Sequence, residues 1–126
     1  MKASCHCGAV RFEIDDAPAS VYECNCSICA KLGALWSYYH PKQVTLLGES
    51  GATSTYVWGD RMIAFHACRT CGCTTHWAAI AAEDPQRMGI NARLMEGVDP
   101  GNVTVRHLDG GGHGWFWTVG APSTGS

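Results

Sequence analysis

The segment Cys24-Asn25-Cys26-Ser27-Ile28-Cys29 places three thiols within six residues, and the other cysteine motifs lie on either side of it. Gaps of one and two residues allow all three sulfurs to point inward from one tight turn. Zinc takes four tetrahedral ligands in proteins, and a catalytic zinc site keeps one position for water or substrate. Three cysteines without an evident fourth ligand nearby are typical of such an open site.

Two pairs of thiols flank this segment, Cys5 with Cys7 and Cys68 with Cys71. Together they supply the four sulfurs of a structural zinc site, which would join the first strand to a distant part of the chain. Metal binding and folding would then be one equilibrium. We therefore expect a four-cysteine zinc site that stabilises the fold. The three-cysteine zinc site would be positioned by that fold and open to another molecule.

The length and the cysteine content narrow the class of protein. A chain of 126 residues predicts a single domain, here over residues 1–120 with a loose tail at 121–126. Eight cysteines fit either a secreted disulfide framework or a metal protein. The pairs are too close in sequence to close useful loops as disulfides, which favours metal. The first residues show no apolar leader, so we expect a reduced, cytoplasmic protein.

The charge pattern argues against nucleic acid and membrane partners. The formal net charge is −2, and the nine Lys and Arg residues are scattered singly. No basic stripe is present to neutralise phosphates, and no apolar helical period follows any cysteine pair. No apolar run approaches the roughly 18 residues of a membrane helix. We expect a small-molecule substrate instead.

The pattern of apolar residues predicts a mainly β fold. Residues 7–14 alternate, with Val10, Phe12 and Ile14 apolar, which is typical of a half-buried strand. Gly59-Asp60 predicts a hairpin turn, and Gly33 predicts the end of a helical turn that starts at Cys29. Further strands are expected at 21–23, 34–40, 44–47, 54–58, 62–67, 74–80, 89–95 and 103–108. The expected architecture is two or three small β-sheets stapled by zinc, with little helix.

The sequence leaves the roles of several cysteine, histidine and aromatic residues open. A fourth ligand for the three-cysteine site could come from Cys73, His66 or His76, or Cys73 could be a small buried apolar residue. The aromatic residues of 34–40 could belong to the hydrophobic core or line a pocket beside the thiols. The aromatic residues 115–117, after a glycine-rich connector, could dock on the body or form the contact of a homodimer.

Four motifs in order resemble the glutathione-dependent formaldehyde-activating enzyme family, which also includes centromere protein V. The motifs are SCHCGAVRFEI at 4–14, ECNCSICAKLGAL at 23–35, FHACRTCG at 65–72 and INARLMEGVD at 90–99. The resemblance implies a mainly β fold with a structural zinc on Cys5, Cys7, Cys68 and Cys71. It also implies a second zinc on Cys24, Cys26 and Cys29, which would be the catalytic residues.

The activity that the resemblance implies is a carbon–sulfur lyase reaction, in which glutathione and formaldehyde combine to S-hydroxymethylglutathione. Another small aldehyde is an equally open substrate, and a non-enzymatic zinc module that binds glutathione or a protein partner is the alternative. Lys31 and Arg69 either meet glutathione carboxylates or are solvated at the surface. Cys73 departs from the Ser or Thr expected after the CxxCG motif, and a thiol there could saturate the second zinc or act as a redox partner.

Overall fold

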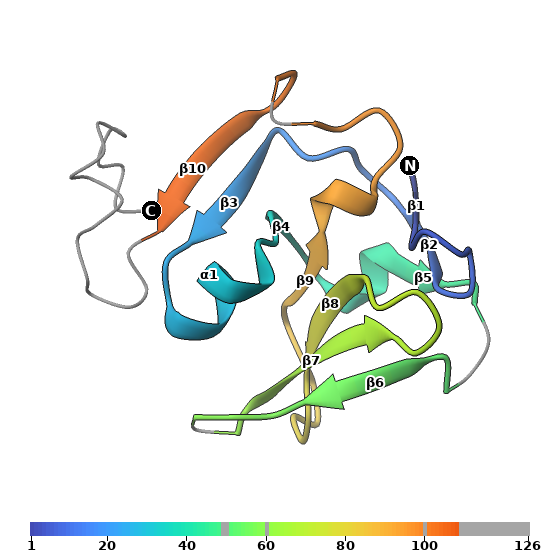
Figure 1. Cartoon of the computed structure of the whole chain (residues 1–126), viewed down its shortest axis with the longest axis vertical. Coiled ribbons are helices and arrows are strands. Elements are labelled where there is room, and N and C mark those ends of the chain that lie inside the picture. The colour runs from blue at the N-terminus through green and yellow to red at the C-terminus, as the bar shows by residue number, and fades with distance from the viewer. Residues whose placement is uncertain (49–50, 60, 100, 109–126) are drawn as a thin grey trace.

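The computed structural model describes residues 1–48, 51–59, 61–99 and 101–108. These residues form ten strands in two sheets, one short α-helix and two single-turn 3-10 helices (Figure 1). The mainly β fold with little helix is therefore confirmed. The predicted tail at 121–126, the glycine-rich connector and the aromatic residues 115–117 lie outside the described residues.

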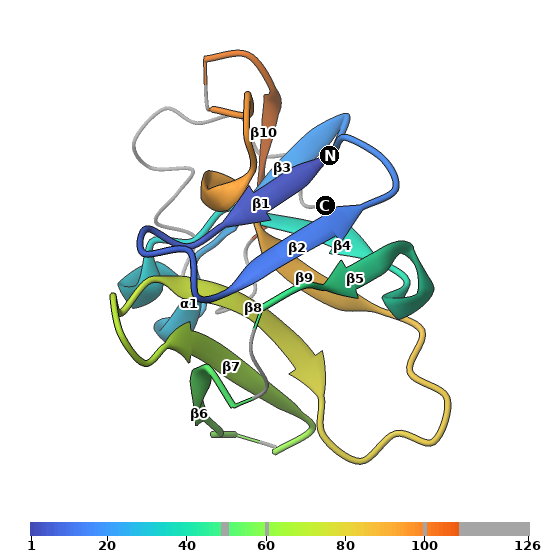
Figure 2. The same cartoon turned by 90° about the vertical axis from the view of Figure 1, so that its right-hand side faces the viewer.

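The smaller sheet contains the N-terminal strands. Its order is β1-β2-β5, all antiparallel, and Figure 2 shows the three strands side by side. The strands are β1 (Lys2–Ser4), β2 (Arg11–Ile14) and β5 (Val44–Leu46). Val10, Phe12 and Ile14 are buried while Arg11 and Glu13 are exposed, which confirms the predicted alternation. The strand begins only at Arg11, because residues 5–10 form a turn closed by a Cys5 N–H to Val10 carbonyl bond of 2.9 Å.

The larger sheet has seven strands in the order β10-β3-β4-β9-β8-β7-β6. All neighbours are antiparallel except β10 and β3, which pair in parallel. The strands are β3 (Ser20–Cys24), β4 (Trp36–Tyr39), β6 (Thr53–Tyr56), β7 (Ile63–Cys68), β8 (Thr74–Ala79), β9 (Met88–Asn91) and β10 (Thr104–Leu108). β6 and β7 pair as the predicted hairpin on either side of Gly59.

The helix α1 (Ser27–Leu32) directly follows β3. Cys26 is its N-cap and Gly33 is its C-cap in the left-handed conformation, as the sequence predicted for the end of this turn. The 3-10 helices are η1 (Pro41–Gln43) and η2 (Ala92–Leu94). The prediction of one strand over residues 89–95 was wrong in its second half. The Asn91 side chain accepts the Arg93 N–H at 3.2 Å, and this local bond turns the chain into η2.

Two groups of buried side chains form the core. The larger group lies around Phe12, Ile14, Val21 and Ile90 and joins the two sheets. The smaller group consists of Cys29, Ala34, Trp36 and Phe65, so α1 packs on the larger sheet through a cysteine. Within the described residues, no helix has the length and apolar character that a membrane span requires.

Candidate metal centres and the adjoining cavity

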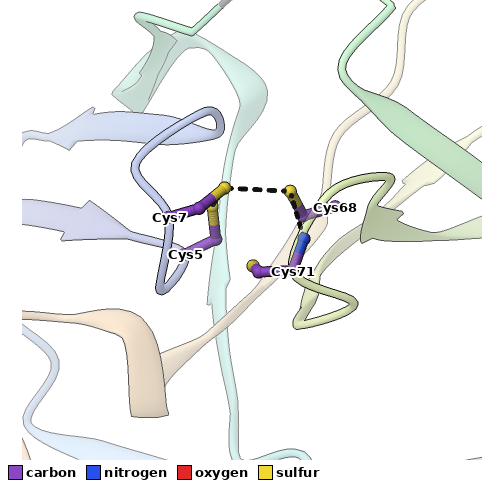
Figure 3. Close-up of side chains that lie close together, drawn as sticks. All are labelled: Cys5, Cys7, Cys68 and Cys71. Atoms are coloured by element: carbon purple, nitrogen blue, oxygen red, sulfur yellow. Dashed lines mark hydrogen bonds between the residues drawn. The ribbon is translucent and has the colours of Figure 1, made fainter.

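Cys5 and Cys7 on the loop between β1 and β2 face Cys68 and Cys71 at the turn between β7 and β8 (Figure 3). The four sulfurs lie within 4.8 Å of one another. The Cys5 and Cys7 sulfurs are 3.7 Å apart, and the Cys7 and Cys68 sulfurs are 3.6 Å apart. Four sulfurs at about 2.3 Å from a tetrahedral zinc would be about 3.8 Å apart, so this four-thiol cluster fits that ion.

Backbone amides are directed at these sulfurs from both loops. The Val10 N–H donates to the Cys5 sulfur at 3.3 Å, and the Thr70 N–H donates to the Cys68 sulfur at 3.4 Å. Gly8 and Gly72 have φ values of +83° and +80°, a conformation that residues with a Cβ rarely adopt, and they allow the two tight turns. The two cysteine loops are therefore similar turns that bring four sulfurs together.

The same amides favour negative charge on the sulfurs. Backbone N–H groups, that of Cys73 first and then that of Cys7, lower the pKa of the Cys71 thiol to about 5. The N–H of Cys71 is the main cause of a lowered pKa at Cys68. A thiolate is the form of cysteine that binds metal, so the loops hold these two donors ready for a cation.

The second cluster is built where β3 meets α1. The sulfurs of Cys24, Cys26 and Cys29 lie within 4.8 Å of one another. Cys24 ends β3, and the sulfur of the N-cap residue Cys26 accepts the Cys29 N–H at 3.4 Å. Helix geometry thus fixes Cys26 relative to Cys29, while the strand fixes Cys24. The three-thiol cluster forms as the spacing predicted.

These three thiols are close enough to oppose one another's ionisation. Contact with the Cys24 thiol, followed by burial, raises the pKa of the Cys29 thiol strongly. Three thiolates at this spacing need a cation to balance their charge. Sulfur donors select zinc and other thiophilic metals over calcium or magnesium, so the donor set fits zinc.

The proposed fourth ligands do not reach the three-thiol cluster. Among the described residues, no further His, Cys, Asp or Glu joins it. Cys73 lies instead beside the four-thiol cluster, where Cys71 and Cys5 influence its pKa. His66 and His76 stack on each other with ring centroids 4.1 Å apart and bond to Thr53 and Thr75. The described residues therefore offer three protein ligands at this place.

A cavity of about 410 Å³ opens beside the three-thiol cluster, and all three cysteines line it. Five aromatic side chains form most of its wall: Trp36, Tyr38, Trp58, Phe65 and Trp77. Ile28 and Ile63 complete the apolar surface. The sequence left open whether the aromatic residues of 34–40 belong to the core or line a pocket. Trp36 and Tyr38 pack in the core and also line this cavity. Lys31 and Arg69 do not line this cavity, and Arg69 bonds to the Thr53 carbonyl at 2.9 Å.

Trp36 supplies a polar atom in this apolar wall. Its side chain is 1% exposed, and its indole N–H makes no well-formed hydrogen bond with the described residues. The N–H lies beside the Cys29 sulfur, where it favours the thiolate and partly opposes the rise in the pKa of Cys29. Trp58, Phe65 and Trp77 were missed as site residues in the sequence, although Phe65 and Trp77 are a cross-strand pair on β7 and β8.

A β fold of this size, with one four-thiol and one three-thiol cluster beside an apolar cavity, defines a class of small proteins with two cysteine sites able to hold metal ions. The chain belongs to the glutathione-dependent formaldehyde-activating enzyme family, whose family model matches residues 1–105. It is also similar to a crystal structure of a Rhodobacter sphaeroides protein, with 32% sequence identity and a TM-score of 0.69. That similarity covers 83% of this chain and 99% of the other.

Proposed function

We propose that this protein is a carbon–sulfur lyase that interconverts a hemithioacetal with a thiol and a small aldehyde. The family name indicates glutathione as the thiol and formaldehyde as the aldehyde. In the condensation direction the thiol sulfur bonds to the carbonyl carbon, the C=O double bond becomes a single bond, and the thiol proton ends on oxygen. The reaction needs no oxidant or reductant. The observation that carries the proposal is the convergence of three thiols on one cavity.

Cys24, Cys26 and Cys29 are the residues that would hold the second metal, and Cys5, Cys7, Cys68 and Cys71 would hold the structural one. When bound at the three-thiol cluster, zinc supplies Lewis acidity toward a carbonyl oxygen and stabilises thiolate at neutral pH. The absence of a fourth protein ligand among the described residues supports an exchangeable position there.

The walls of the cavity would orient the thiol and the aldehyde and donate hydrogen bonds to them. Enclosing the thiol and the aldehyde together converts an encounter in solution into a reaction between neighbours. Burial raises the pKa of the Tyr38 hydroxyl, so that this group stays protonated at neutral pH and can donate to the oxygen that gains the proton. The Trp36 N–H stabilises negative charge at the Cys29 sulfur. The apolar side chains exclude water and strengthen both interactions.

The test follows hemithioacetal formation from glutathione with formaldehyde and with propanal, above the spontaneous rate. The variants are Cys26→Ser, which removes one thiol of the cluster, and Cys73→Ser, which removes a thiol outside it. We expect acceleration by the wild type and by Cys73→Ser, and a fall of about a hundredfold or more for Cys26→Ser. Equal rates for wild type and Cys26→Ser with both aldehydes would contradict the lyase. Glutathione binding that depends on Cys26 without acceleration would show a binding module instead.

A further inference from the structure

The cavity beside the three-thiol cluster is much larger than a one-carbon aldehyde. Its volume of about 410 Å³ lies within the range of roughly 300–1,000 Å³ that is typical of sites for drug-sized ligands. Formaldehyde has two heavy atoms and would fill a small part of this space. The volume therefore calls for a larger group bonded to the reacting carbon or sulfur.

The lining of the cavity also fits an uncharged group. Apart from the thiols, the described lining residues are Ile28, Trp36, Tyr38, Trp58, Gly59, Ile63, Phe65 and Trp77, and none has a charged side chain. Glutathione carries two carboxylates and an ammonium group, and burying unpaired charges here would be unfavourable. The Arg87 guanidinium lies 5.4 Å from the centroid of the Tyr38 ring, and Arg87 is not among the lining residues. The interior of the cavity is therefore better suited to an apolar group than to the peptide part of glutathione.

The aromatic wall is held in place by the sheet. Trp77 on β8 pairs with Gly89 on β9, and a Cβ at position 89 would overlap the Trp77 indole ring. Gly89 thus allows the indole to lie across the neighbouring strand, where its ring centroid is 6.1 Å from that of Tyr38. Trp36 and Phe65 are also 6.1 Å apart between centroids. Trp58, in the turn of the β6–β7 hairpin, is 41% exposed and forms the rim.

We propose that the aldehyde partner of this site carries an apolar group of about the size of a phenyl ring, seated among Trp36, Tyr38, Trp77 and Trp58. The proposal rests on the lyase function given above and specifies its substrate class. The reaction is unchanged: the sulfur–carbon bond forms as the C=O double bond opens, and the thiol proton passes to oxygen. Aromatic side chains favour such a group through buried apolar area and ring–ring contacts.

The first experiment measures binding without reaction. Benzyl alcohol and methanol are non-reacting analogues of an aromatic and a one-carbon aldehyde, and tryptophan fluorescence reports their binding to the zinc-loaded protein. We expect saturable binding of benzyl alcohol and none of methanol at equal concentrations. Trp58→Ala should weaken benzyl alcohol binding about fivefold. Tyr56→Ala is the matched control, because Tyr56 is an exposed aromatic residue of the same hairpin that does not line this cavity.

The second experiment compares acceleration of hemithioacetal formation with phenylacetaldehyde and with formaldehyde, each with glutathione. We expect the acceleration to be at least about tenfold greater for phenylacetaldehyde, and Trp58→Ala and Gly89→Ala to lower this ratio. Trp58→Ala keeps the test valid if Gly89→Ala does not fold. Equal acceleration of both aldehydes, with no saturable benzyl alcohol binding, would overturn the proposal while leaving the lyase intact. Saturable binding without acceleration of any aldehyde would reject the lyase but retain the apolar site.

Discussion

Trp36 is a buried residue of the same core group as Cys29 of the three-thiol cluster. Its N–H lies beside the Cys29 sulfur and makes no well-formed hydrogen bond with the described residues. Trp36→Phe keeps a ring in the wall and removes this N–H. If this N–H bonds to the Cys29 thiolate, a contribution of about 1.5–3 kcal/mol is lost, and we expect acceleration of hemithioacetal formation to fall about tenfold or more.

A purely structural role for Trp36 would give a different result. In cobalt-substituted protein, the thiolate-to-metal absorption band should shift in Trp36→Phe if the N–H bonds to the Cys29 sulfur. The smaller ring should also lower the free energy of unfolding, by about 1–2 kcal/mol. Lost stability with an unchanged band and an unchanged rate would show that Trp36 only fills space.

His76 predicts an acid-sensitive component of stability. Burial, and then the neighbouring His66, lower the pKa of His76 to about 3, whereas an unfolded histidine has a pKa of about 6.5. Between these values the unfolded chain binds the proton and the folded chain does not, so stability falls as the pH falls. From pH 7.5 to 5.5 this one group accounts for about 1.4 kcal/mol.

The variant His76→Phe isolates this component. Phenylalanine can keep the ring contacts with His66 and with Phe12, whose centroid is 5.1 Å from that of His76. Urea unfolding of zinc-loaded wild type and variant at both pH values should show the wild type losing about 1.4 kcal/mol more. The same loss in both proteins would mean that His76 titrates normally in the folded state.

At the scale of elements, the four-thiol cluster joins the loop before β2 to the turn between β7 and β8. The register of β7 and β8 shifts between His66 and Ala67, immediately before Cys68. Such a bulge redirects a strand and here coincides with its approach to the N-terminal loop. The cluster is thus the place where a turn of the larger sheet meets the β1–β2 loop of the smaller sheet.

Loss of this cluster should release both loops together. We expect Cys5→Ser, or removal of metal by a chelator, to lower stability by several kcal/mol, which corresponds to a Tm decrease of roughly 10 °C or more. Hydrogen exchange should rise at residues 5–10 and 68–73 in the same variant. Cys73→Ser is the matched control, since this thiol lies beside the cluster without being one of its four members. A Tm for Cys5→Ser equal to that of Cys73→Ser would contradict the structural role.

The local spacing of residues in the sequence predicted the three-thiol cluster and the buried face of a strand, and the reason is physical. The thiols of Cys24, Cys26 and Cys29 lie within one turn, so their spacing alone brings them together. Alternation predicted the buried face of β2 in the same way. The boundary at Asn91 was missed, because a side-chain bond to Arg93 outweighs the apolar alternation of residues 89–95.

The cavity was not predictable in this way. Phe65, Trp77 and Gly89 become neighbours only through the register of β7, β8 and β9, and the sequence does not state register. Which of the described residues could serve as a fourth ligand also depends on tertiary structure. Cys73 was one of the candidates, yet the turn that follows Cys71 keeps its thiol at the other cluster.

For the molecule as a whole, the two clusters have separable roles. One cluster joins two segments that are far apart in the sequence, and the other is confined to one turn beside the cavity. We therefore expect Cys26→Ser to remain folded, with a Tm within a few degrees of wild type, while its acceleration of hemithioacetal formation is lost. The single-domain boundary at residue 120 and the cytoplasmic location stay predictions of the sequence.

Native mass spectrometry of the protein purified under reducing conditions, with the zinc content counted per chain, measures both clusters at once. Two zinc ions are expected on wild type and on Cys73→Ser, and one on Cys26→Ser. The mass of the denatured chain should correspond to eight free thiols. A wild-type protein that folds without zinc, or a Cys26→Ser variant that keeps the full wild-type zinc content, would contradict the assignment of these seven cysteines to two metal centres.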